Sequence, residues 1–110
     1  MHWIPLTDDK QLDQIIADSF QKPIAIYKHS TRCSISLMVK RSLETNWKAP
    51  DEEIPAYYLD LLNYRAVSNK IAGIFDIRHE SPQLILVKNG KAVYHASQSE
   101  IDYAEMSAKK

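Results

Sequence analysis

The sequence predicts a single α/β domain spanning residues 1–110, with a central four-stranded mixed sheet flanked by helices on both faces. Apolar residues recur at helical spacing in some segments, and these alternate with short apolar segments typical of buried strands. The last two strand-like segments are joined by Asn89-Gly90, a strong indicator of a tight hairpin between antiparallel strands. The predicted order is therefore helix, strand, helix, strand, helix, strand, strand, helix.

In the first half of the chain, a helix is predicted over about Asp8 to Ser19, because Leu12 and Ile15 share one face behind acidic capping residues. Residues 24–28 are predicted to form a short apolar strand that is long enough to lie in the middle of the sheet. The helical period then returns, and it predicts a second helix from Cys33, as its first residue, to about Asn46.

The second half is predicted to hold a strand, a short helix, the two hairpin strands and a final helix. These lie at residues 56–62, 68–75, 83–88, 91–96 and 99–106. Ser68 is the expected cap of the short helix, and Ser99 followed by Asp102 is expected to start the last one. No repeat or linker divides the chain.

Composition narrows the classes of partner. The 14 basic and 14 acidic side chains cancel, so no overall field attracts nucleic acid or an anionic membrane, and neither is expected as a partner. No apolar run approaches the roughly 20 residues of a membrane span, and the N-terminus lacks a basic leader, so we expect a cytoplasmic protein. The four histidines lack metal-site spacing, so no metal is expected.

The single cysteine, Cys33, is predicted to lie where a buried strand passes through a polar turn into a helix. Free N–H groups and a partial positive charge at a helix start favour a thiolate over a thiol. Arg32 and His29 can add positive charge, and Thr31 or Ser36 can donate a hydrogen bond to the sulfur anion. We therefore expect faster alkylation of Cys33 at neutral pH than of an unperturbed thiol. Ser36 stands where a dithiol redox motif has its second cysteine.

This element order, with a thiol at the first strand-to-helix turn, resembles the thioredoxin fold over almost the whole chain. The resemblance implies a cis proline at Pro82, whose backbone faces the active cysteine. The acidic residue that thioredoxins carry on the strand before the thiol is Tyr27 here.

Four separated segments are similar to the monothiol bacilliredoxins, the redox-active YtxJ-like family of the bacillithiol system. They are residues 31–36, 58–65, 79–83 and 94–97. The resemblance implies a monothiol thiol–disulfide oxidoreductase that removes bacillithiol from protein mixed disulfides through Cys33. Its partners would be client proteins and the small thiol, which acts as co-substrate, with no bound cofactor. The small thiol would lie between the Cys33 turn and Pro82, with Arg32 as a donor to its carboxylates and with Ser81, Gln83 and His79 as further contacts.

Less specific interpretations remain open. Cys33 can be a small buried hydrophobic residue, Arg32 a solvated turn residue, and Pro82 the ordinary start of an edge strand. The alternative function is then a redox-inactive thioredoxin-like binding or adaptor module. A thiol peroxidase or arsenate-type reductase would also use one sulfur, but the spacing of a threonine–cysteine–arginine peroxidase pocket is not evident.

Overall fold

The computed structural model describes residues 1–110. In chain order its elements are β1 (Trp3–Pro5), α1 (Asp9–Asp18), β2 (Ile24–His29), α2 (Ser34–Asn46), β3 (Ala56–Asp60), α3 (Arg65–Phe75), β4 (Gln83–Lys88), β5 (Lys91–Ser97), a 3-10 helix η1 (Gln98–Glu100) and α4 (Tyr103–Ser107). The strands form one sheet in the order β1-β3-β2-β4-β5. β1, β3 and β2 are parallel, whereas β4 is antiparallel to β2 and β5 to β4. The predicted mixed α/β sheet is confirmed, with five strands rather than four.

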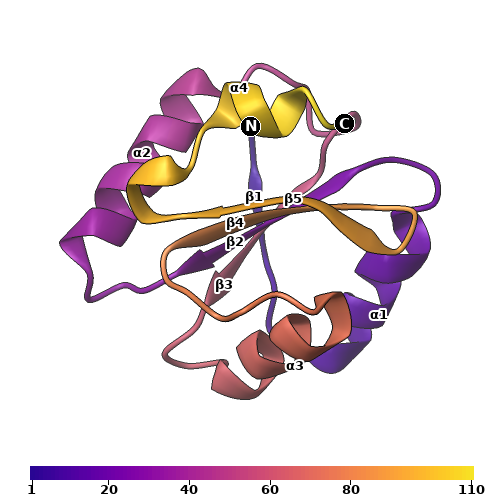
Figure 1. The fold of residues 1–110 in the computed structure, drawn as a ribbon, viewed down its shortest axis with the longest axis horizontal. Coiled ribbons are helices and arrows are strands. Elements are labelled where there is room, and N and C mark those ends of the chain that lie inside the picture. The colour runs from indigo at the N-terminus through magenta and orange to yellow at the C-terminus, as the bar shows by residue number, and fades with distance from the viewer.

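Helices cover both faces of the sheet, α2 and α4 on one side and α1 and α3 on the other (Figure 1). Because side chains alternate along a strand, β2 contributes to two separate cores. Ile24 and Ile26 pack on the side of α1 and α3, and Ala25 and Tyr27 pack on the side of α2 and α4. All six residues of β2 are buried, so the turn that follows this strand projects from a rigid base.

β1 is the strand that the sequence analysis missed. It spans three residues, pairs in parallel with β3 and ends at Pro5, which has no N–H to donate to a ladder. Trp3 fixes this edge by donating its indole N–H to Glu44 Oε2 at 2.7 Å and by packing against Tyr27. So short a strand shows no periodicity, and it is defined by its contacts with β3.

The predicted start of the third helix was wrong. α3 begins at Arg65, and Ser68 lies buried inside it without capping it. The N–H groups of Asn63 and Tyr64 donate to the carbonyl of Asp60, so the turn after β3 leads directly into this helix, and β3 ends at Asp60 rather than at residue 62.

The final predicted helix is divided. The 3-10 helix η1 is followed by α4, whose cap is the Asp102 carboxylate, an acceptor for the N–H of Ala104 at 2.8 Å. The β4–β5 hairpin is confirmed, and Asn89 and Gly90 take φ values of 53° and 75°, the left-handed geometry that favours these two residues.

Candidate functional site

Cys33 is the N-cap of α2, whose first residue is Ser34, one position after the helix start that the sequence predicts. Its N–H donates to the carbonyl of Ser30 at 3.1 Å, and its own carbonyl accepts from Leu37. The residue is partly exposed, and its side chain does not cap the helix. The thiol thus stands at the positive end of a 13-residue helix and within reach of solvent.

The hydroxyl of Ser36 is bonded to the residues before the thiol and not to the sulfur. Ser36 Oγ lies 2.8 Å from His29 Nδ1 and accepts the N–H of Ser30 at 3.1 Å. The Tyr27 hydroxyl donates to the carbonyl of Ser36 at 2.7 Å. The expected hydrogen bond from Ser36 to Cys33 is therefore not formed, because the hydroxyl is fully buried and already engaged on the inner side of the turn.

Burial also changes the expected role of His29. Removal from water lowers its pKa, and the positive charge of Lys40 lowers it further, so the ring is neutral near pH 7. His29 therefore does not add the positive charge beside the thiol that the sequence analysis expected. Burial raises the pKa of Tyr27 to about 12, and an electrostatic interaction with Cys33 adds to this increase, so Cys33 lies within electrostatic range of the Tyr27 hydroxyl.

The two residues before the thiol are open to solvent. Thr31 and Arg32 are both exposed, and neither takes part in the three ion pairs of the protein, Lys40–Glu44, Lys70–Asp9 and Lys110–Glu53. Arg32 is thus a free cation directly next to Cys33 in the chain.

The Pro82 turn leaves the same end of the sheet as the Cys33 turn. Lys28, at the end of β2, is the register partner of Gln83, at the start of β4. The loop before β4 and the turn after β2 accordingly lie side by side, on the left of Figure 1. The Ser81–Pro82 peptide bond is cis, the isomer that the resemblance implies. The buried Pro82 accepts the backbone N–H of Gln98 at its carbonyl, at 3.0 Å.

Two polar atoms flank Pro82 without a partner in the protein. Ser81 Oγ and Gln83 Oε1 are both buried and form no hydrogen bond. The amide nitrogen of Gln83 is occupied, since it donates to the carbonyl of Arg78 at 3.1 Å. A buried polar atom without a partner is costly, so each of these two oxygens keeps an unused capacity to accept a hydrogen bond.

His79 is exposed, yet one edge of its ring is turned inward. Its Nδ1 lies 3.2 Å from Nζ of the fully buried Lys28 and 3.3 Å from Oγ of Ser68. Lys28 also donates to the carbonyl of Ser68 at 3.1 Å. These contacts connect the loop before Pro82 to β2 and α3.

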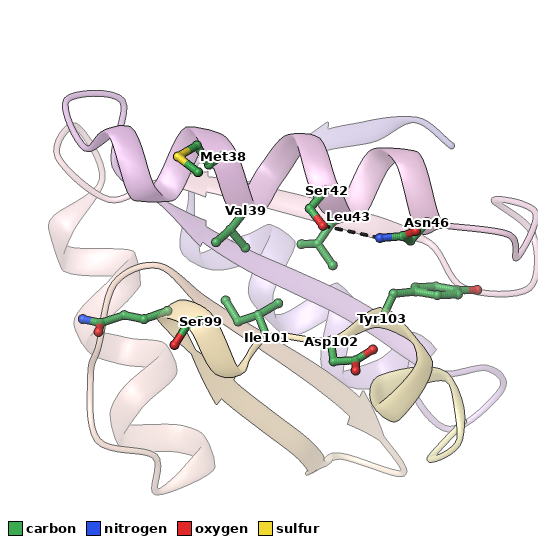
Figure 2. Close-up of a pocket in the computed structure, with 10 residues that line it drawn as sticks. Met38, Val39, Ser42, Leu43, Asn46, Ser99, Ile101, Asp102 and Tyr103 are labelled. Atoms are coloured by element: carbon green, nitrogen blue, oxygen red, sulfur yellow. Dashed lines mark hydrogen bonds between the residues drawn. The ribbon is translucent and has the colours of Figure 1, made fainter.

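A groove of about 420 Å³ lies between α2 and the segment from η1 to α4 (Figure 2). Met38 and Val39 line it from α2, and Ile101 and Tyr103 line it from the other side. Met38 is also open to solvent, together with Ile35 and Leu37 on the first turns of α2. An apolar surface therefore adjoins the helix that carries the thiol.

No group of three or more His, Cys, Asp or Glu side chains is arranged to hold a metal ion. None of the helices is both long and apolar enough to cross a bilayer.

Solved structures similar to this chain are thioredoxin-fold proteins. One, described provisionally as an oxidoreductase with a thioredoxin fold, matches with a TM-score of 0.83 and 26% identity, over 96% of this chain and 91% of that one. Thioredoxin from Malassezia sympodialis matches with a TM-score of 0.72 and 16% identity, over 98% and 92% of the two chains. Thioredoxin from Halobacterium salinarum, as an N21Q mutant, matches with a TM-score of 0.69 and 17% identity, over 96% and 86%.

The fold and the thiol at the start of α2 define a thioredoxin-fold protein of the thiol oxidoreductase class. A model of the family "Monothiol bacilliredoxin BrxC" matches residues 4–106, nearly the whole chain. The chain belongs to this family, as the four segments noted in the sequence indicate.

Sequence reasoning missed Lys28, Ser68 and Gln98 at this end of the sheet. Lys28 carried a usable signal, because it is a lysine on the same strand face as Ile24 and Ile26, where burial is expected. Gln98 carried none, since its φ of 52° and its bond to Pro82 depend on the corner after β5.

Proposed function

We propose that this protein removes a low-molecular-weight thiol, bacillithiol, from client proteins that hold it as a mixed disulfide. The observation that carries the proposal is a lone, partly exposed cysteine at the start of α2, in a chain whose residue 36 is a buried, hydrogen-bonded serine. With no second thiol in the chain, a disulfide within the protein is excluded, which favours a monothiol cycle.

The cycle consists of two thiol–disulfide exchanges. The Cys33 thiolate attacks the small-thiol sulfur of the mixed disulfide, the bond between the two substrate sulfurs breaks, and the client cysteine leaves as a thiolate. Cys33 now holds the small thiol in a disulfide. A second small thiolate attacks the sulfur of that bound thiol, so Cys33 returns as a thiolate and the small-thiol disulfide departs. Each step exchanges one disulfide for another, and the electrons balance.

The site residues have roles toward the small thiol and toward the sulfur of Cys33. Arg32, exposed beside the thiol, is a donor to the carboxylates of bacillithiol and favours the anionic sulfur. Ser81 and Gln83 offer their unpartnered buried oxygens to the small thiol, and the backbone before Pro82 can pair with the extended small thiol as an added strand would. His79 is a further contact. Thr31 is the remaining candidate to donate a hydrogen bond to the sulfur, because its side chain is exposed whereas the hydroxyl of Ser36 is engaged elsewhere.

Client proteins would approach over the apolar surface of Ile35, Leu37 and Met38. The reaction requires free small thiol to reset Cys33, so the proposed location is the reducing cytoplasm.

The test is intact mass spectrometry after mixing the protein with a client peptide that carries bacillithiol. We expect Cys33 to gain the mass of bacillithiol as the free peptide appears, and Cys33→Ser to show neither change. The same peptide carrying glutathione or coenzyme A shows whether Cys33 also accepts other small thiols. If no mixed disulfide transfers its small thiol to Cys33, the enzyme proposal fails and the redox-inactive adaptor is favoured.

A further inference from the structure

Lys28 is a buried cation that no carboxylate neutralises. Its side chain is fully buried on the strand that leads to the thiol, and it takes part in none of the ion pairs. Burying an ammonium group costs free energy unless its hydrogen bonds are satisfied. The partners that the structure provides are the carbonyl of Ser68 on α3 and Nδ1 of His79 in the loop before Pro82.

These partners determine which ring nitrogen of His79 carries the proton. An ammonium group has donors only, so Nδ1 of His79 must accept from Lys28. Partial removal of the ring from water at its inward edge, together with the positive charges of Lys28 and Arg65, lowers the pKa of His79, so the ring is neutral near pH 7. A neutral imidazole has one N–H, and with Nδ1 as the acceptor this N–H is at Nε2.

The N–H at Nε2 is on the edge of the ring opposite the one that faces Lys28 and Ser68. His79 is exposed although its Nδ1 edge is turned toward Lys28 and Ser68. The residue lies three positions before Pro82, in a loop that Gln83 also holds through the carbonyl of Arg78. A donor is therefore available at the rim of the Pro82 turn, at the end of the sheet where Cys33 lies.

We infer that Lys28 is a positioning residue, which holds His79 as an Nε2–H donor to an anionic group, such as a carboxylate, of the small thiol bound at the Pro82 turn. This inference rests on the proposed function and adds a determinant of substrate charge to it. Lys28 itself does not touch the substrate, because it is buried beneath His79.

The first experiment reads the His79 tautomer by ¹⁵N NMR near pH 7. In the wild-type protein we expect the proton at Nε2. Lys28→Met keeps roughly the length of the side chain and removes its donors. In this variant we expect a larger share of the Nδ1–H form than in the wild-type protein. A proton at Nδ1 in the wild-type protein, or a tautomer unchanged in Lys28→Met, overturns the inference.

The second experiment compares exchange rates with two substrates, a client peptide carrying bacillithiol and the same peptide carrying bacillithiol in which every carboxylate is methyl-esterified and therefore uncharged. We expect the wild-type protein to prefer the charged substrate about tenfold, in line with a hydrogen bond to a charged group. Lys28→Met and His79→Ala should reduce this preference, and the part that remains is the contribution of Arg32. His79→Gln, whose amide N–H can take the place of Nε2–H, should retain most of it, as should the surface control Lys91→Met.

Equal rates for both substrates in the wild-type protein, or an undiminished preference in Lys28→Met and His79→Ala, overturn the inference. Because His79 is exposed, His79→Ala and His79→Gln should both fold. If Lys28→Met does not fold, an undiminished preference for the charged substrate in His79→Ala still overturns the inference. Absence of any exchange at Cys33 is a different result: it ends the proposed function, and the NMR measurement alone then decides whether Lys28 sets the tautomer of His79.

Discussion

The hydroxyl of Ser36 lies 2.8 Å from Nδ1 of His29, and both groups are buried. Ser36 stands three residues after the thiol, where a dithiol protein would carry its second sulfur. In this chain the position instead holds the turn before α2 together, since the same oxygen accepts the N–H of Ser30. The loss of a resolving thiol is thus accompanied by a structural function for the residue that replaces it.

Ser36→Ala is expected to destabilise the protein by about 1–3 kcal/mol, because it leaves the Ser30 N–H and His29 Nδ1 without their partner in a buried place. The measurement is the free energy of unfolding in urea. The control is Ser34→Ala, at an exposed serine on the first turn of the same helix, which should change stability by less than about 0.5 kcal/mol. Equal stabilities of the two variants would contradict the role assigned to Ser36.

Ser36→Cys is expected to change the chemistry from a monothiol to a dithiol cycle. Residues three apart on a helix lie near enough for the Cα separation of roughly 4.4–6.8 Å that disulfides need. After reaction with a bacillithiolated peptide, the new thiol should displace bacillithiol from Cys33, so intact mass should show the loss of two hydrogens and no lasting adduct. An adduct as persistent as that of the wild-type protein would show that position 36 cannot reach the sulfur.

The sequence predicted the parts of the fold that depend on local patterns. The helix containing Leu12 and Ile15 and the Asn89-Gly90 hairpin follow from side-chain period and from backbone freedom, both of which operate within a few residues. β1 was missed because its three residues acquire their conformation from β3. Ser68 was misassigned as a cap because its hydroxyl is used in tertiary contact with His79 rather than at a helix end.

The candidate site divides in the same way. The position of Cys33 at a helix start is local and could be predicted to within one residue. The partners of Ser36 and the contact of Lys28 with His79 join segments whose distance depends on the packing of α2 and α3 on the sheet. The sequence places His29 near the thiol but does not predict its charge. Burial lowers the pKa of His29 and so makes the ring neutral.

The stability of the protein should rise with pH between about 8 and 9.5 because of Lys28. Burial lowers the pKa of Lys28 from 10.5 to about 8 in the folded protein. The unfolded chain, with an ordinary lysine, therefore binds more protons across this interval, and a rise in pH favours the folded state. His29 and His79 have lowered pKa values and remain neutral in this window, and the raised pKa values of Tyr57 and Tyr94 act only near and above pH 10.

Urea unfolding at several pH values compares the wild-type protein with Lys28→Met, in which this increase should disappear. The groups in contact with Lys28 are the Ser68 carbonyl on α3 and the His79 ring, and neither carries a charge in this range. Parallel pH profiles for the two proteins would show that Lys28 keeps an ordinary pKa.

Arg32 should accelerate the reaction of Cys33 with iodoacetamide, because a positive charge beside the sulfur favours the thiolate. The side chain is exposed, so the effect is that of a surface charge, worth roughly 0.2–1 kcal/mol, and Arg32→Gln should slow alkylation at neutral pH about two- to fivefold at low ionic strength. Arg41→Gln removes an equal charge from an exposed position farther along α2 and should leave the rate nearly unchanged.

Salt near 1 M shortens the screening length to about 3 Å, so the difference between wild type and Arg32→Gln should then shrink. A loss of rate that persists at high salt would mean that Arg32 acts by shaping the turn rather than by its charge, and an unchanged rate at low salt would leave the start of α2 as the source of reactivity.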